Sequence, residues 1–74
     1  MPKLPVISGS DVIKKLEKLG YTVTRQKGSH VRLHHTDESN KKPLTIPLHS
    51  ELKPGLLNQI LKDADISREK FSEM

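Results

Sequence analysis

The hydrophobic positions near the start of the chain repeat with the spacing of an α-helix. They form one face of a segment whose other face is rich in lysine: Val12, Ile13, Leu16 and Leu19. Ser8 or Ser10 can cap this helix, which is expected to begin near Asp11, because a serine oxygen accepts the hydrogen bond of a free helix amide. Gly20 stands where a chain leaves a helix through a left-handed backbone conformation. Residues 1–7 contain two prolines and predict a flexible N-terminus.

Three further segments alternate hydrophobic and polar residues, as half-buried strands do. They cover residues 21–26, 29–35 and 44–48. Lys27 and Gly28 predict the turn between the first two strands, and the polar residues 36–42 predict a loop before the third. Pro47 cannot donate to a strand ladder, so the third segment is expected to be an edge strand or one about to end.

A second helical pattern begins at Pro54, a residue that suits the first turn of a helix. Its predicted hydrophobic face comprises Leu56, Leu57, Ile60, Leu61 and Ala64. We expect this helix to end near Asp65, after which Ser67 can cap a last short turn that carries Phe71. Residues 72–74 predict a frayed tail.

The order of helix, three strands and helix indicates an α+β fold. A three-stranded antiparallel sheet can bury one face under two helices, which leaves its other face open. On the second strand, Val31 and Leu33 are expected to face the helices. The alternation then places His30, Arg32 and His34 together on the open face.

The composition bounds the class of protein. The 74 residues leave room for one domain, residues 1–74, whose core is thin because only 32% of the residues are hydrophobic. The chain has no cysteine, which excludes disulfides, thiolate metal ligands and a cysteine nucleophile. No hydrophobic run approaches a membrane span or a signal-peptide core, so we expect a cytoplasmic protein. The net charge of +4 favours a polyanionic partner such as nucleic acid.

His30 is the candidate catalytic residue, because histidine titrates near neutrality and can both accept and donate a proton. In RNA, a base that removes the proton of a 2′-hydroxyl allows attack on the adjacent phosphate, and a nearby cation stabilises the charge that develops. Lys27 and Arg32 lie close to His30 and are candidate RNA-binding residues. Gly28 lets the backbone approach a ligand closely. Ser29 can contact a phosphate through its amide or hydroxyl, or can simply close the turn.

The remaining histidines leave alternatives open. His34 and His35 point to opposite faces of a strand, so at most one of them can join His30. His49 follows the third strand and could lie beside the second, but its interpretation as a polar strand end is the stronger one. A zinc site is disfavoured, because cysteine is absent and no set of three or four ligands is evident. We therefore expect no metal and no cofactor.

Three short motifs occur in order along the chain: the Gly-Ser-His of residues 28–30, the Pro-Leu-His of residues 47–49 and the Lys-Pro-Gly of residues 53–55. With the Lys-Leu-Gly-Tyr at the end of the first predicted helix, they make the chain similar to the HicA toxins from about Ser8 to Phe71. These toxins are the RNA-cleaving members of HicA–HicB toxin–antitoxin pairs.

The resemblance implies a fold like the double-stranded-RNA-binding domain and ribosome-independent cleavage of mRNA, with His30 as the catalytic residue. It also implies a HicB-like antitoxin that covers the toxin and masks this histidine. It assigns no second catalytic group, although His49 matches a position where the family often has histidine. Because strand cleavage usually uses both a base and an acid, His34, His49 or neither can be the second group.

Two other functions fit part of the pattern. A non-catalytic module that grips duplex RNA by its shape needs the basic open face but not the histidine, and it predicts salt-sensitive binding of RNA that stays intact. A protein-interaction domain predicts no affinity for RNA. The aromatic residues are Tyr21 and Phe71 alone, which argues against recognition by stacked bases.

Overall fold

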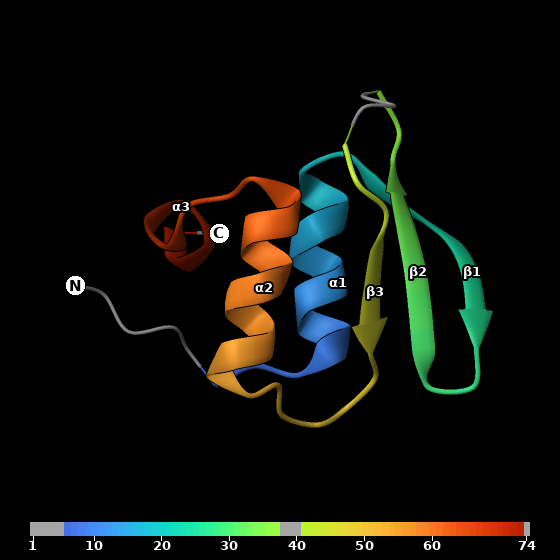
Figure 1. Ribbon diagram of the computed structural model, residues 1–74, viewed down its shortest axis with the longest axis horizontal. Coiled ribbons are helices and arrows are strands. Elements are labelled where there is room, and N and C mark those ends of the chain that lie inside the picture. Colours follow the sequence, from blue (N-terminus) through green and yellow to red (C-terminus); the bar gives the residue numbers. More distant parts are fainter. Residues whose placement is uncertain (1–5, 38–40, 74) are drawn as a thin grey trace.

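A computed structural model describes residues 6–37 and 41–73, and within them it places three helices and one three-stranded sheet (Figure 1). In chain order the elements are α1 (Gly9–Lys18), β1 (Tyr21–Lys27), β2 (His30–His35), β3 (Leu44–Pro47), α2 (Pro54–Ala64) and α3 (Arg68–Glu73). The predicted α+β class and the order of a helix, three strands and a helix are confirmed. The short turn expected after Ser67 is a third helix, α3.

Helix α1 begins at Gly9, earlier than the sequence predicts. Ser8 is its cap, and its hydroxyl oxygen accepts the backbone N–H of Asp11 at 3.2 Å. A β-carbon at Gly9 would overlap the carbonyl oxygen of Pro47, so the start of α1 packs directly on the end of β3. Gly20 follows the helix with φ +99°, as predicted for a residue that needs a left-handed backbone.

The sheet has the order β1-β2-β3, and both neighbouring pairs are antiparallel. The third strand is therefore an edge strand with Pro47 as its last residue, as predicted. Helices α1 and α2 lie against one face of the sheet, and α3 lies beside α2, away from the sheet (Figure 1). The opposite sheet face, called the open face below, carries none of the helices in the described part of the chain.

The hydrophobic core lies between the sheet and the helices. Val31 and Leu33 are 3% and 0% exposed, whereas His30, Arg32 and His34 on the same strand are exposed. The predicted faces of β2 are therefore confirmed. This strand presents its hydrophobic residues to the helices and its cationic and histidine side chains to solvent.

One predicted core residue of the second helix is not buried. Leu56 is 39% exposed, while the later residues of that hydrophobic face are buried. Leu52, which precedes the helix, is buried in the core instead, and its amide donates to the carbonyl oxygen of Ile7 at 2.8 Å. The segment before the helix thus fills the core near the first turn, and Leu56 is left facing solvent.

The two ends of the described chain are packed more firmly than the sequence predicts. Ile7, assigned to a flexible N-terminus, is a core residue, and Ser72 and Glu73, assigned to a frayed tail, belong to α3. Phe71 anchors α3 because its ring is fully buried and lies 4.6 Å from the Lys15 ammonium. The predictions for residues 1–5 and 74, and for residues 38–40 of the loop, fall outside the described residues.

Candidate functional site

An irregularity in β1 determines which side chains stand on the open face. Val23 pairs with Leu33, but the next pair along the ladder is Arg25 with Arg32, so Thr24 is an extra residue in β1. In a regular strand, alternation would place Arg25 on the same face as Val23, toward the helices. The β-bulge at Thr24 instead turns Arg25 to the open face, opposite Arg32.

The same bulge places Lys27 on the open face. Lys27 pairs with His30 across β1 and β2, and His30 is exposed on that face. Arg32 in turn pairs with Thr45 of β3. The open face therefore carries two neighbouring rungs, meaning sets of residues paired across adjacent strands. One contains Lys27 and His30, and the other contains Arg25, Arg32 and Thr45.

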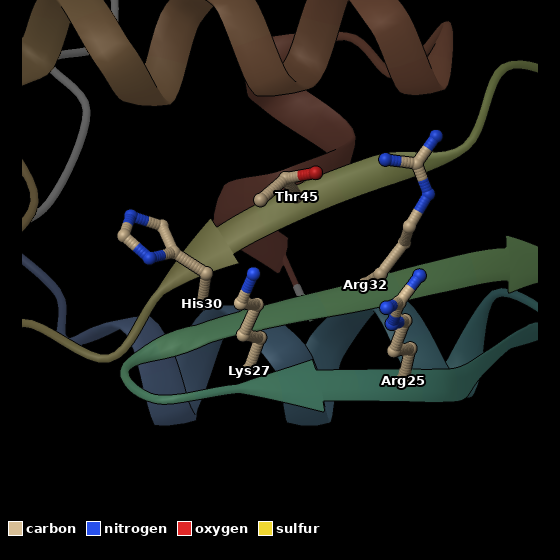
Figure 2. Close-up of a pocket in the computed structure, with 5 residues that line it drawn as sticks. All are labelled: Arg25, Lys27, His30, Arg32 and Thr45. Atoms are coloured by element: carbon tan, nitrogen blue, oxygen red, sulfur yellow. The ribbon is translucent and has the colours of Figure 1, made fainter.

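These two rungs line a shallow hollow of about 250 Å³, called the basic depression below. Its lining consists of Arg25, Lys27, His30, Arg32 and Thr45, and all five side chains project from the same face of the sheet (Figure 2). His30 and Lys27 lie at one end, and the two arginines lie at the other. The lining contains four groups that can carry positive charge and no carboxylate, so the depression attracts anions.

The hairpin turn that joins β1 to β2 holds Lys27 and His30 opposite each other. Gly28 has φ +59°, and a β-carbon there would meet nothing within 4 Å, so glycine serves the backbone conformation rather than close packing. The side-chain amide of Gln26 donates to the carbonyl oxygen of Gly28 at 3.2 Å. The carbonyl oxygen of Ser29 accepts the amide of Leu48 at 2.7 Å, which ties the turn to the chain after β3.

His34 and His35 point to opposite faces, as predicted for adjacent strand residues. His34 is exposed on the open face, where its Nδ1 lies 2.7 Å from the hydroxyl of Thr24. His35 is half-buried on the helix side. Its Nε2 lies 3.0 Å from the carbonyl oxygen of Leu19, and its Nδ1 accepts the amide of Asp37 at 3.2 Å. Since a carbonyl can only accept, Nε2 carries the proton, and His35 connects structural elements.

His49 lies outside the basic depression, as does His34. Its backbone carbonyl accepts the amide of Gly9 at 2.9 Å, while its side chain is exposed. Among residues 6–37 and 41–73, no three histidine or carboxylate side chains gather closely enough to hold a metal ion.

Of the five site residues predicted from sequence, His30, Lys27 and Arg32 line the depression, and Gly28 and Ser29 form the turn at its end. Sequence reasoning missed Arg25 and Thr45. Strict alternation hides Arg25, because the extra residue of a bulge has no signature in the hydrophobic pattern of this strand. Only the pairing register reveals it.

Comparison with known families places the chain in a family. The family model described as "HicA toxin of bacterial toxin-antitoxin" matches residues 9–66 of the 74-residue chain. The matched range begins with α1, contains the whole sheet and α2, and ends before α3. It therefore includes every residue of the basic depression. A search of curated proteins found no match. No helix in the described part of the chain is long and hydrophobic enough to cross a membrane.

Proposed function

Because the chain belongs to the HicA toxin family, and so is the toxin of a toxin–antitoxin system, we propose that it is a metal-independent endoribonuclease that cleaves mRNA with His30. The observation that supports this most directly is the place of His30. The imidazole is exposed at one end of the basic depression, opposite Lys27, in a lining without carboxylates. A phosphodiester can reach the imidazole ring, and the cationic side chains of the same depression lie beside it.

The chemistry follows from the two groups that share this rung. The His30 imidazole removes the proton of a 2′-hydroxyl, and the O2′ atom attacks the adjacent phosphorus. As the new P–O2′ bond forms, the P–O5′ bond breaks, which leaves a 2′,3′-cyclic phosphate and a free 5′ end that takes up a proton. The ammonium of Lys27 stabilises the negative charge that develops on the phosphate oxygens.

RNA binding in this proposal depends on backbone charge rather than on base stacking. Lys27 and Arg32 contact phosphates, and the turn of Gly28 and Ser29 lets the RNA backbone approach the end of the sheet. The two aromatic residues of the chain, Tyr21 and Phe71, are both buried in the core, so neither can stack on a base. We therefore expect strongly salt-dependent binding.

The toxin–antitoxin family implies an antitoxin partner. We propose that this partner is HicB-like, that it covers the open face and that both proteins act in the cytoplasm. An antitoxin seated there covers the exposed side chain of His30, because the helices and the core lie on the other side of the sheet. Inhibition then requires no change of shape in the toxin.

The test compares purified wild-type protein with His30→Ala on a single-stranded RNA, with a chelator present throughout. We expect wild type to cleave and His30→Ala to lose about 10²- to 10⁴-fold in rate, the usual contribution of one acid–base group. Matching thermal unfolding curves would show that the variant folds. Equal cleavage by both proteins would reject the assignment. Salt-sensitive binding by both with no cleavage would instead identify a non-catalytic RNA-binding module.

A further inference from the structure

The arginine end of the basic depression has no role in the chemistry proposed for His30, and its arrangement is unusual for a sheet. Arg25 and Arg32 are direct partners across β1 and β2, and both are exposed on the open face. Like charges directly opposite each other destabilise a strand pair. Neither Thr45, the third residue of this rung, nor any other lining residue supplies a negative charge. An anion bound between the two guanidinium groups relieves this repulsion.

The bulge makes the pair possible. If the same sequence paired with β2 in a regular ladder, Thr24 would stand opposite Arg32, and Arg25 would face the helices. Thr24 itself is held on the open face, where its hydroxyl lies 2.7 Å from Nδ1 of His34 and 3.4 Å from the carbonyl oxygen of Arg32. The irregularity is thus fixed by contacts and brings a second arginine to a fixed place beside the first.

The spacing of the rungs favours an RNA backbone as the source of the anion. His30 and Arg32 are alternate residues of one strand, so they are about 7 Å apart along β2. That distance resembles the separation of neighbouring phosphates in an extended RNA strand. A guanidinium group binds phosphate with two parallel hydrogen bonds, which a lysine ammonium cannot do.

We infer that Arg25 and Arg32 form a second phosphate-binding subsite, which holds the RNA phosphate one linkage away from the phosphate attacked at His30. This inference rests on the proposed nuclease function. It adds a substrate-binding residue, Arg25, and it places the bound RNA strand along the line of β2, in either of the two directions. The subsite contributes binding energy to ground state and transition state alike. Its loss therefore raises KM more than it lowers kcat.

The first experiment tests the subsite by measuring RNA binding in the absence of cleavage. In a His30→Ala background, the affinity for a short single-stranded RNA is measured against salt concentration. Each phosphate contact contributes about 0.7 to the slope of log K against log salt, so Arg25→Gln is expected to lower that slope by about this amount. Arg25→Lys, which keeps the charge, retains the slope. Arg68→Gln is the matched control, because Arg68 is exposed on α3, away from the sheet. Equal slopes for Arg25→Gln and Arg68→Gln would overturn the subsite.

The second experiment locates the contacted phosphate. Wild type and Arg25→Gln receive RNAs with one uncharged methylphosphonate linkage, placed one position to either side of the cleaved bond. We expect the neutral linkage on one side to raise KM for wild type severalfold and to change KM little for Arg25→Gln. Equal effects on both proteins, at both positions, would show that Arg25 binds elsewhere. Absence of cleavage by wild type on every RNA would count against the nuclease function itself, while the binding experiment still decides the subsite.

Discussion

Gly28 holds a backbone conformation on which the position of His30 depends. Its φ of +59° strains any residue with a β-carbon, although space around it is free. We expect Gly28→Ala to lower the free energy of unfolding by about 1 kcal/mol, measured by urea denaturation. Gly55→Ala is the matched control, because Gly55 lies in the first turn of α2 at an ordinary φ with equally free space. That change is expected to stabilise by about 0.4–1 kcal/mol. Loss of stability in both variants would contradict the backbone explanation.

His34 and His49 are expected to be dispensable for cleavage. Neither side chain lines the basic depression, and His34 contacts Thr24 instead of facing the rung of His30. The substitutions His34→Ala and His49→Ala should each leave kcat within about threefold of wild type, well short of the 10²-fold or more that an acid–base group contributes. A loss of that size in either variant would identify it as a second catalytic group and enlarge the site beyond the depression.

The site residues on β2 could be predicted from the sequence because strand alternation is strict there. Val31 and Leu33 identify the buried face, and the faces of His30 and Arg32 follow directly. Arg25 could not be predicted in the same way, since its face depends on a pairing irregularity between two strands. Lys27 was predicted from its nearness in sequence to His30, and it reaches the correct face only because of that irregularity.

Among the elements, β1 can be altered by two alternative single-residue deletions. Together they distinguish the effect of the bulge geometry from the effect of the Arg25 charge. Deleting Thr24 makes the pairs Val23–Leu33 and Arg25–Arg32 consecutive in a regular ladder, with Arg25 still on the open face. Deleting Arg25 also gives a regular ladder, but Thr24 then stands opposite Arg32. We expect the first deletion to keep the salt dependence of RNA binding and the second to reduce its slope by about 0.7.

Circular dichroism and urea denaturation of both deletion variants serve as the control for folding. The interpretation depends on both chains keeping the sheet, which the short and regular ladder favours. If the deletion of Thr24 weakens RNA binding as much as the deletion of Arg25, the twist of the bulge rather than the arginine charge matters for binding.

The elements themselves were largely predictable, because each boundary has a local chemical cause. Ser8 caps α1, Gly20 follows it and Pro54 opens α2. Asp65 ends α2 in the left-handed conformation, at φ 58°. The sequence predicts only a short turn at the third helix, because its six residues contain one hydrophobic anchor, Phe71, and one anchor shows no period. Its position depends instead on contacts with α1, which is distant in sequence.

In the whole molecule, the two faces of the sheet have different roles, and this explains how so short a chain can have both a core and a functional surface. One face is covered by α1 and α2 and supplies the core, while the open face carries the charged rungs (Figure 1). The hydrophobic pattern predicted this division. In the proposed function, RNA and antitoxin compete for the same open face, so the toxin can be inhibited without being unfolded.

The stability of the whole protein is expected to depend on α3, although this helix lies away from the basic depression. A 74-residue domain is stable by about 4–11 kcal/mol at the usual ~0.05–0.15 kcal/mol per residue. Phe71 is fully buried, and its carbonyl oxygen accepts the Lys15 ammonium at 3.2 Å. We expect Phe71→Ala to lower the free energy of unfolding by about 3–5 kcal/mol, seen as a lower urea midpoint. Glu69→Ala, an exposed change in the same helix, should shift it by less than about 0.5 kcal/mol.

The fraction of Phe71→Ala that stays folded should nevertheless retain its site. No residue of α3 lines the basic depression, and the family match ends before this helix begins. At a low temperature and without denaturant, the variant should therefore bind RNA with the wild-type salt slope, after correction for the folded fraction. A changed slope in the folded protein would show that α3 shapes the open face through the core. The sheet and the helix layer would then act as one unit rather than as a site on a separate support.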